Sequence, residues 1–297
     1  MRDLLSTKQV AEYLGINEKK VYYLAKTGKL PCTRVTGKWL FPKNLIDRWI
    51  EESSRVRTGR EGQRNFLLAA GSDDPSLGIL RDLYGSRKTV PSLFMATVGS
   101  SAGLEAIRDG VADFALAHLL DPETGNYNVA FVERTIPSGV VVVPLFHREL
   151  GLLARAGNPL RLRTLADLTR TGLRMINRQK GSGTRHYIDH EFSKLGVETK
   201  NIAGYDEAVA THLEAGMKIL RQEADAGIAT RAAARLLGLD FIPFTQERFD
   251  MLIPKERFFA PQIQTLLEIV GSREFRSRVE AMGGYDTSES GRIIAAN

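Results

Sequence analysis

The chain has 297 residues, 43% of them hydrophobic and 26% charged, the composition of an ordinary globular protein that is long enough for two domains. No apolar stretch approaches the roughly 20 residues of a membrane-spanning helix, and the first residues lack the apolar core of a secretory signal. The single cysteine, Cys32, excludes an internal disulfide, so we expect a cytoplasmic protein.

Positive charge is concentrated at the beginning of the chain. Residues 1–64 contain 14 Lys and Arg against 7 Asp and Glu, whereas the rest of the chain contains 27 basic and 28 acidic residues. A basic segment attached to a nearly neutral body is typical of a polyanion-binding module joined to a domain with another task.

Two short helices are predicted in the basic segment. Ser6 or Thr7 can cap the first helix, which is expected to end at Gly15, and Asn17 can cap the second, which is expected to end at Gly28. Apolar residues fall on one face of each helix. Two such helices joined across a short turn have the spacing of a helix-turn-helix.

The solvent face of the second helix is predicted to reach phosphates and base edges in a DNA major groove. The residues expected on this face are Lys19, Lys20, Tyr22, Tyr23 and Lys26. Because Tyr22 and Tyr23 are adjacent, they point about 100° apart on a helix, and one of them is expected to pack inward. A merely solvated helix face is the alternative interpretation of the lysines.

A small β-hairpin, or wing, is expected next. It is predicted to run from Leu30 through a Thr36-Gly37 turn to Phe41, with Arg34 and Lys38 near its tip as further DNA-binding residues.

A third helix is expected after the wing, and Pro42 suits its first turn. Residues 51–64 are polar and basic, so we interpret them as a helix end that runs into a linker. The predicted boundaries are therefore residues 1–54 for the DNA-binding domain and 55–64 for the linker.

Three runs occur in order in this part of the chain: LSTKQVAEYLGINEKKVYYLAKTGKLP, VTGKWLF and LIDRWIEE. Over about residues 3–53 they resemble the excisionase-like, MerR-related winged helix-turn-helix domains. The resemblance implies binding of double-stranded DNA. Since one helix-turn-helix covers a single half-site, a homodimer is expected on DNA.

From Asn65 the pattern changes to alternating strands and helices, which favours a doubly wound α/β architecture. Strands are predicted at residues 66–70, 92–98 and 112–117, with a helix at 102–109. Residues 112–117 and 224–229 share the pattern A-D-x-[AG]-[LI]-A. This echo suggests two similar lobes in succession with a cleft between them.

The stretch NRQKGSGTR, residues 177–185, follows a predicted strand and precedes a helix predicted at 186–195. Its glycines would let backbone N–H groups point into one small volume at the helix N-terminus, a good geometry for an oxyanion. Its spacing matches neither a Walker A loop nor G-x-G-x-x-G, so a nucleoside triphosphate is not expected. The alternative is a Ser/Gly-rich surface turn. The residues predicted to bind the ligand here are Ser182, Gly183, Thr184 and Arg185.

Two further turns have the same chemistry: Gly71-Ser72 and Gly99-Ser100-Ser101, each between a predicted strand and a helix start. Ligands of open α/β folds bind at this edge of the sheet. The sequence therefore predicts a pocket between the lobes lined by hydroxyl and amide groups, with Ser72, Ser100 and Ser101 as ligand-binding residues.

The segments AGSDDPSL, VGSSAGLEAIRDGVADFALAHLLDPETGNYN, MINRQKGSGTRHYID and EADAGIATRAAA resemble the type 2 periplasmic-binding-protein fold, over about residues 66–292. They are most similar to the PBP-like domain found fused to helix-turn-helix modules or to molybdenum-cofactor enzymes. The resemblance implies a two-lobed domain over residues 65–297 that binds molybdate or tungstate without chemistry, through serine hydroxyls and backbone N–H groups. A charged Arg185 would also suit a carboxylate or a phosphate ester.

No catalytic or metal-binding set is evident, so no enzyme activity and no cofactor is expected. His186 and His190 have metal-ligand spacing but no third ligand, which favours a solvated helix face. His118 and His212 could reach the cleft, although ordinary hydrogen-bonded histidines are the default.

The expected fold class is α/β, with a small winged helix-turn-helix domain followed by a two-lobed type 2 periplasmic-binding-protein-like domain. The predicted function is a DNA-binding transcription regulator that senses a small anion. The alternatives are a cofactor-biosynthesis enzyme or a carrier protein that uses the same cleft without regulatory DNA binding.

Overall fold

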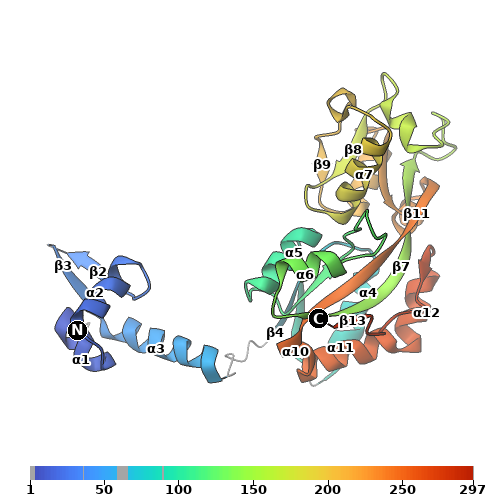
Figure 1. The fold of residues 1–297 in the computed structure, drawn as a ribbon. Helices are drawn as coiled ribbons and strands as arrows, with labels where there is room; N and C mark the ends of the chain where they lie inside the picture. Colours follow the sequence, from blue (N-terminus) through green and yellow to red (C-terminus); the bar gives the residue numbers. More distant parts are fainter. Residues whose placement is uncertain (1–3, 36, 59–65, 89, 297) are drawn as a thin grey trace. The chain divides into compact units, whose positions relative to one another are not determined.

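A computed structural model describes residues 4–35, 37–58, 66–88 and 90–296. The chain divides into two compact units, Met1–Arg64 and Asn65–Asn297. Figure 1 shows the first in blue and the second in colours from cyan to red. None of the helices in the described part of the chain has the length and apolar character that a bilayer crossing requires.

The first unit packs a three-stranded sheet, in the order β1-β3-β2, against three helices. Ser6 and Gln9 form a capping box at the first helix, Gly15 closes that helix in a left-handed conformation, and Asn17 caps the second. The elements are β1 (Leu4–Ser6), α1 (Thr7–Leu14), α2 (Glu18–Lys26), β2 (Thr33–Val35), β3 (Lys38–Pro42) and α3 (Lys43–Thr58). Their buried core consists of Val10, Ala11, Val21, Ala25, Leu30, Phe41 and Ile46.

This unit differs from the sequence prediction at three points. β1 pairs with β3 and was not predicted, because three residues are too short for a strand pattern. Pro42 ends β3 instead of lying in the third helix. Helix α3 continues to Thr58, past the residue where the linker was predicted to begin, and the predicted linker residues 59–64 lie outside the described residues.

The second unit is built on one mixed sheet with the strand order β5-β4-β6-β11-β7-β10-β8-β9, and β12 and β13 pair with β7 beside this path. The strands are β4 (Phe66–Gly71), β5 (Ser92–Thr97), β6 (Phe114–Ala117), β7 (Val140–Ala154), β8 (Met175–Arg178), β9 (Ala208–Val209), β10 (Ala226–Thr230), β11 (Asp240–Pro254), β12 (Tyr285–Asp286) and β13 (Ala295–Ala296).

The long strands β7 and β11 join two lobes. They pair antiparallel along their whole length, and Figure 1 shows them running from one lobe into the other. The parallel strands β4 to β6 extend the sheet from β11 in lobe 1, and β8 to β10 extend it from β7 in lobe 2. Arg148 faces Glu247 in the middle of the long pair, between register shifts at Pro243/Thr245 and Phe249/Asp250.

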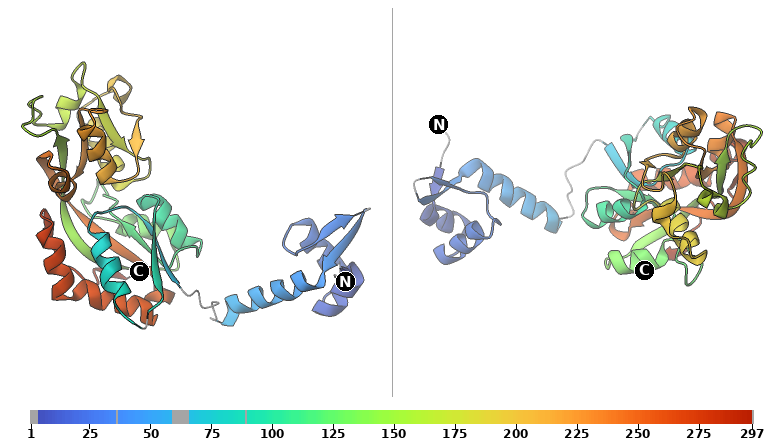
Figure 2. Two further views of the ribbon diagram at one scale, coloured as in Figure 1. Left: turned by 180° about the vertical axis from the view of Figure 1, so that it is seen from behind. Right: turned by 90° about the horizontal axis from the view of Figure 1, so that it is seen from above.

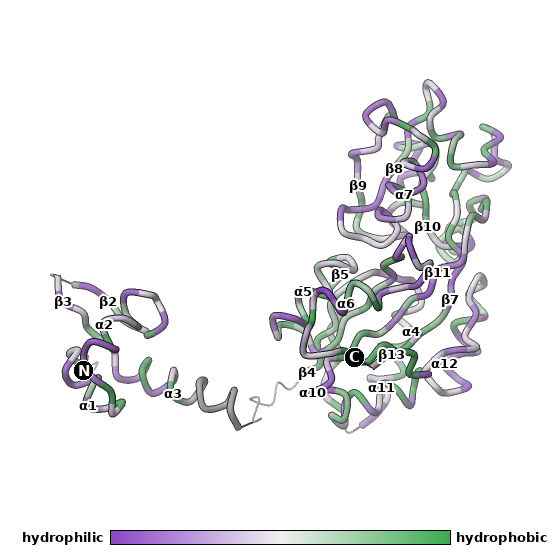
Figure 3. Tube along the Cα trace, in the orientation of Figure 1, coloured by the Kyte–Doolittle hydropathy of each residue, from purple (hydrophilic) through white to green (hydrophobic). Residues whose placement is uncertain are grey.

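Helices cover both faces of the sheet in each lobe, as the hydrophobic clusters and Figure 2 show. In Figure 3 hydrophobic and polar stretches alternate along these helices, as expected when only one face is buried. Lobe 1 carries α4 (Leu77–Gly85), α5 (Ser100–Arg108), α6 (Val129–Thr135), α10 (Lys255–Phe258), α11 (Pro261–Gly271) and α12 (Arg273–Ala281). Lobe 2 carries α7 (Gly183–Lys194), α8 (His212–Leu220), α9 (Arg231–Leu237) and the 3-10 turns Leu165–Thr169 and Thr199–Asn201.

The two lobes repeat one order of elements. Lobe 1 runs β4-α4-β5-α5-β6 and lobe 2 runs β8-α7-β9-α8-β10, and in each lobe the third strand is parallel to the first. The two segments with the shared A-D-x-[AG]-[LI]-A pattern lead into β6 and β10, which hold equivalent places. The two-lobed α/β fold predicted from the sequence is therefore confirmed.

Candidate functional site: a closed cleft between the two lobes

The three predicted serine turns meet where the lobes face each other. The hydroxyl oxygens of Ser72, after β4, and Ser100, at the start of α5, lie 2.7 Å apart. The backbone N–H of His118 donates to the Ser100 hydroxyl at 3.2 Å. From lobe 2, the carbonyl oxygen of Gly181 accepts a hydrogen bond from the N–H of Ser101, also at 3.2 Å. The lobes thus touch directly at these turns.

Two glycines of this region have no room for a side chain. Gly71 has a φ of 145°, and a Cβ on it would lie 2.1 Å from the carbonyl oxygen of Leu116 on the neighbouring strand of the same lobe. A Cβ on Gly183, the first residue of α7, would lie 2.5 Å from both Nδ1 and the carbonyl oxygen of His118 in the other lobe. The contact at Gly183 and the hydrogen bond from Ser101 to Gly181 both join the lobes directly, so the structure is a closed form of the two lobes.

The start of α7 contributes a buried hydroxyl to the cleft. Ser182 caps the helix by accepting a hydrogen bond from the N–H of Arg185 at 3.1 Å, so the helix begins at Gly183, three residues before the predicted start. Thr184 is fully buried, and its hydroxyl has no hydrogen-bond partner among the described residues. Native proteins leave few such groups unpaired, which makes Thr184 a candidate ligand contact.

The charge of Arg185 is used within lobe 2, contrary to the expectation from the sequence. Its Nε lies 2.8 Å from a carboxylate oxygen of Asp189, and its guanidinium carbon lies 4.2 Å from the centre of the Tyr205 ring. A ligand in the cleft would therefore find this guanidinium already engaged.

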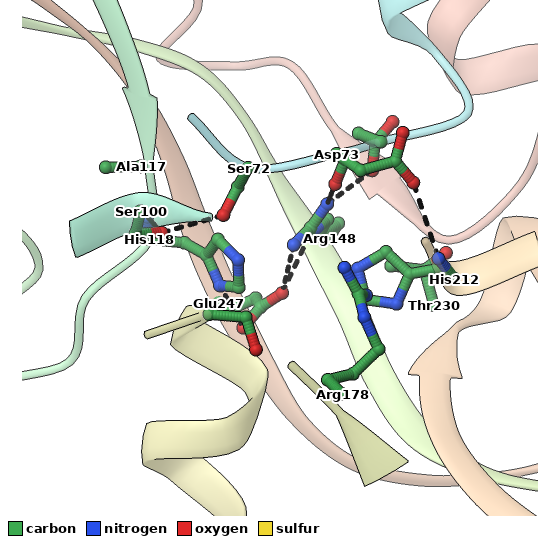
Figure 4. Close-up of polar contacts among 12 residues, drawn as sticks. Ser72, Asp73, Ser100, Ala117, His118, Arg148, Arg178, His212, Thr230 and Glu247 are labelled. Carbon is green, nitrogen blue, oxygen red and sulfur yellow. Dashed lines mark hydrogen bonds and ion pairs between the residues drawn. The ribbon is translucent and has the colours of Figure 1, made fainter. Parts of the chain in front are cut away.

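Arg178, the last residue of β8, is the cation that lacks such a partner (Figure 4). Its side chain is 2% exposed, and its Nη2 donates to the carbonyl oxygen of Ala210 at 2.7 Å. Among the described residues its Nε and Nη1 have no hydrogen-bond partner and no carboxylate forms an ion pair with it. Burial lowers the pKa of Arg178 to about 10, which leaves the guanidinium charged at neutral pH.

His212, the first residue of α8, lies with Arg178 in the same buried region (Figure 4). Its backbone N–H donates to a carboxylate oxygen of Asp73 at 3.3 Å, which links the lobes a second time. Neither ring nitrogen has a hydrogen-bond partner in the described part of the chain. Burial, followed by the charges of Arg178 and Arg148, holds the pKa of His212 well below its ordinary value, so its ring is neutral.

The acidic neighbour Asp73 lies near these two side chains, and no ion pair of the described residues engages it. Burial raises the pKa of Asp73, an effect that the charge of Arg178 opposes and that of Asp74 reinforces.

A second arginine, Arg148 on β7, is fully balanced. Its Nη1 lies 2.6 Å from Asp74 and its Nη2 lies 2.6 Å from Glu247, while the other oxygen of Glu247 lies 2.9 Å from Nδ1 of His118. Burial disfavours the charge of Glu247, but His118 and Arg148 outweigh this effect and lower its pKa to about 2. Arg148 is therefore a structural ion-pair centre, although its Nη2 makes no hydrogen bond of good geometry, whereas Arg178 has no carboxylate partner among the described residues.

Arg178 and Arg148 were not among the site residues predicted from the sequence. Arg178 lies inside the stretch 177–185, and its place at the end of a strand was the available signal. Arg148 lies in a strand whose polar residues show no pattern that marks a ligand site. His118 and His212 were noted as able to reach the cleft, which both do.

The predicted DNA-contacting face of α2 is exposed. Lys19, Lys20 and Lys26 all reach solvent, and Tyr22 and Tyr23 are 49% and 53% exposed. The expectation that one tyrosine packs inward is therefore wrong, because the only residues that α2 buries are on its opposite side, Val21 and Ala25.

The wing is present as the hairpin of β2 and β3. Arg34 and Lys38 are exposed on it, and the Arg34 guanidinium lies 5.6 Å from the centre of the Trp39 ring. Within the described residues no group of three His, Cys, Asp or Glu could hold a metal ion, and His186 instead places Nε2 3.4 Å from the hydroxyl of Ser101 in the other lobe.

Profiles of two families match the chain. One, described as a helix-turn-helix domain, matches residues 4–54, and the other, described as a PBP superfamily domain, matches residues 85–271. The chain belongs to the PBP superfamily domain family. Both matches agree with the resemblances stated from the sequence.

Relatives of this PBP superfamily protein include the uncharacterized protein YvgK of Bacillus subtilis (strain 168), 28% identical over 302 residues, which cover 97% of this chain and 96% of YvgK. An uncharacterized protein from the ferredoxin 2Fe-2S gene 5' region of Clostridium pasteurianum is 32% identical over 108 residues, covering 36% of this chain and 96% of that protein.

Solved structures with the same fold include a putative phosphate ABC transporter substrate-binding protein from Clostridium perfringens with bound phosphate. It has a TM-score of 0.55 and 12% identity and covers 73% of this chain and 97% of that one. A mutant of OxyR from Corynebacterium glutamicum, H2O2-bound, has a TM-score of 0.53 and 12% identity and covers 93% of this chain and 90% of its own. The combination of a helix-turn-helix with a PBP superfamily domain is that of a DNA-binding regulator with a ligand-binding domain.

Proposed function

We propose that this protein is a transcription regulator that binds duplex DNA through its first unit and a small anion in the cleft of its second. The observation that carries the proposal is the buried Arg178, whose Nε and Nη1 have no partner among the described residues. Desolvating a guanidinium costs several kcal/mol, and a nearby negative charge offsets that cost. An anion in the cleft would supply this charge.

The neighbouring groups support an oxyanion. Because Ser72 and Ser100 share a single hydrogen bond and Ser100 accepts from His118, one hydroxyl hydrogen of the pair is free to donate, whichever way the bond runs. Thr184 offers a second hydroxyl. The residues proposed to bind the ligand are Ser72, Ser100, Ser101, Ser182, Gly183 and Thr184, now joined by Arg178 and His212.

Molybdate and tungstate are the candidates that the sequence resemblance implies, and phosphate is a third. The protein from Clostridium perfringens that shares this fold is described as holding phosphate.

Ligand binding would act on DNA by a population shift. An anion that contacts both lobes stabilises the closed form, and operator affinity changes if the two forms present the DNA-binding residues differently. The proposed DNA-binding residues are Lys19, Lys20, Tyr22, Tyr23, Lys26, Arg34 and Lys38. We propose domain limits of residues 1–54 and 65–297, a homodimer on DNA and action in the cytoplasm.

A thermal-shift screen against molybdate, tungstate, sulfate, phosphate and small carboxylates tests the anion site. An anion at 100 times its Kd should stabilise the wild-type protein by about 2.7 kcal/mol, and Arg178→Met, which keeps the side-chain length without the charge, should lose the shift. Arg170→Met, at an exposed arginine of lobe 2, is the matched control and should retain it. An equal shift in Arg178→Met would remove Arg178 from the site.

A mobility-shift assay with and without the stabilising anion tests regulation. A regulator should show salt-dependent DNA affinity that the anion changes. A carrier protein would bind the anion without salt-dependent DNA affinity, and an enzyme would consume its ligand over time.

A further inference from the structure

His212 has hydrogen-bonding capacity that an anion alone does not satisfy. The residue is 0% exposed, and both ring nitrogens lack a partner within the described part of the chain. A neutral imidazole has one N–H donor and one nitrogen that only accepts. Oxyanion oxygens without protons only accept, so they can pair with the first nitrogen and leave the second unpaired.

Burial, and after it the charges that face His212, keep its ring neutral when no ligand is bound. Arg178 approaches from β8, Arg148 from β7 and His118 from the end of β6, and the first two are cations that oppose a further positive charge. The acidic groups of this region are Asp73 after β4, Asp74 before α4, Glu247 on β11 and Glu214 on α8. Asp74 and Glu247 are paired with Arg148, which reduces their effect on the ring.

An anion placed between Arg178 and His212 favours the charged form of the His212 ring. It cancels the repulsion from Arg178 and offers oxygen acceptors to a second ring N–H. A charged imidazole would donate from both ring nitrogens, so both nitrogens of His212 could have a hydrogen-bond partner.

The closed lobes limit the size of the ligand. Direct hydrogen bonds cross the cleft on two sides, from Ser101 to Gly181 and from His212 to Asp73, and Gly183 lies against His118 with no room for a methyl group. Contacts this close leave no room for a sugar, a nucleotide or a peptide unless the lobes open.

We propose that this site takes up a compact dianionic oxyanion together with one proton from solvent, and that the proton resides on His212, so that both of its ring N–H groups donate. This inference rests on the anion site of the proposed function and adds the charge state of its ligand. It predicts that affinity depends on pH. Between the pKa values of His212 in the free and the bound protein, affinity should rise about tenfold for each unit by which pH falls.

Titration calorimetry with molybdate, and separately with sulfate, in two buffers of different ionisation enthalpy measures the protons taken up on binding. Molybdate and sulfate remain dianions through the neutral range, so the ligand itself does not supply the change. The wild-type protein should take up about one proton per anion. His212→Asn keeps one donor and one acceptor but cannot be protonated, and it should bind more weakly with no proton uptake.

His190→Asn is the matched control, since His190 is a half-buried histidine on α7 outside the cluster. It should take up the same proton as the wild type. Thermal unfolding without ligand shows that each variant is folded. Binding without proton uptake in the wild type would overturn the inference and leave the anion site intact. Proton uptake that persists in His212→Asn would overturn the assignment to His212. If neither molybdate nor sulfate binds saturably, and no anion raises the melting temperature in the thermal-shift screen, the proposed function itself is overturned.

Discussion

Glu247 and Asp74 together balance the charge of Arg148 at the middle of the two long strands. The Arg148 and Asp74 side chains have no exposed surface, and that of Glu247 is 3% exposed. Loss of one partner from a buried ion pair leaves an uncompensated charge, which costs much more than the pair contributes. The stability of the second unit should therefore depend on this cluster.

Glu247→Gln should destabilise the protein by about 3 kcal/mol at neutral pH, because Arg148 then keeps one carboxylate. The pKa of Glu247 is lowered from 4.5 to about 2, so its stabilising effect is complete above pH 4.5 and is lost as pH falls toward 2. Urea unfolding of the wild type and the variant at successive pH values should show the difference shrinking in that window. Glu289→Gln, at a half-exposed carboxylate near His147, should change stability little. An undiminished difference at low pH would contradict the role given to the Glu247 charge.

Ser182 allows a test of the anion loop that preserves helix capping. Asp and Asn cap helices about as well as Ser, so both variants should keep α7. Ser182→Asp places a negative charge beside the ligand and should abolish the anion-induced melting shift, whereas Ser182→Asn should retain most of it. Equal behaviour of the two variants would show that the loop does not face the anion.

Helix α7 is the element that closes the cleft, and Gly183 determines how closely it approaches lobe 1. Gly183→Ala would bring a Cβ to 2.5 Å from backbone and ring atoms of His118, so the helix start must move away. Overpacking of this kind costs about 1–3 kcal/mol, which should weaken anion binding about tenfold or more in a calorimetric titration. Gly78→Ala is the matched control, since Gly78 is also near a helix start and a Cβ there meets nothing within 4 Å. Comparable loss in both variants would point to a general effect on folding.

The elements that the sequence predicted are those with local signals. β4, β5, β6 and α5 have continuous apolar runs or helical spacing between glycine turns, and all four are present within a few residues of the predicted limits. β7 and β11 were not predicted, because each carries charged residues in its middle, such as Arg148 and Glu247. These charges pair across about a hundred residues of sequence, a relation that no local pattern contains.

The residues of the candidate site also fall into those with a local sequence signal and those without one. The serine turns were recognisable because glycine and hydroxyl residues at a strand end mark a ligand-binding edge. Arg178 and Arg185 look alike in the sequence, and only the fold shows that Asp189 engages one of them while the other has free donors.

At the scale of the whole chain, the concentration of positive charge in the first unit should determine how DNA binding responds to salt. Lys20→Ala with Lys26→Ala removes two exposed cations of α2, and the slope of log K against log salt should become shallower by about 2. Anion affinity should not change, because these lysines belong to the other compact unit. Lys194→Ala with Lys200→Ala, at exposed lysines of lobe 2, is the matched control and should leave the slope unchanged. Joint loss of DNA and anion binding in the first pair would instead indicate that the variant is misfolded.

The antiparallel pair of β7 and β11 carries the ion-pair cluster near its middle, where the two lobes join. Register shifts on both sides of Glu247 interrupt the regular ladder, so bending would concentrate between them. A rotation of a few degrees in this part of the strands would displace the far ends of the lobes by several ångströms, as in hinge closure. Anion binding at the centre of the second unit would in this way produce a larger movement at the ends of its lobes.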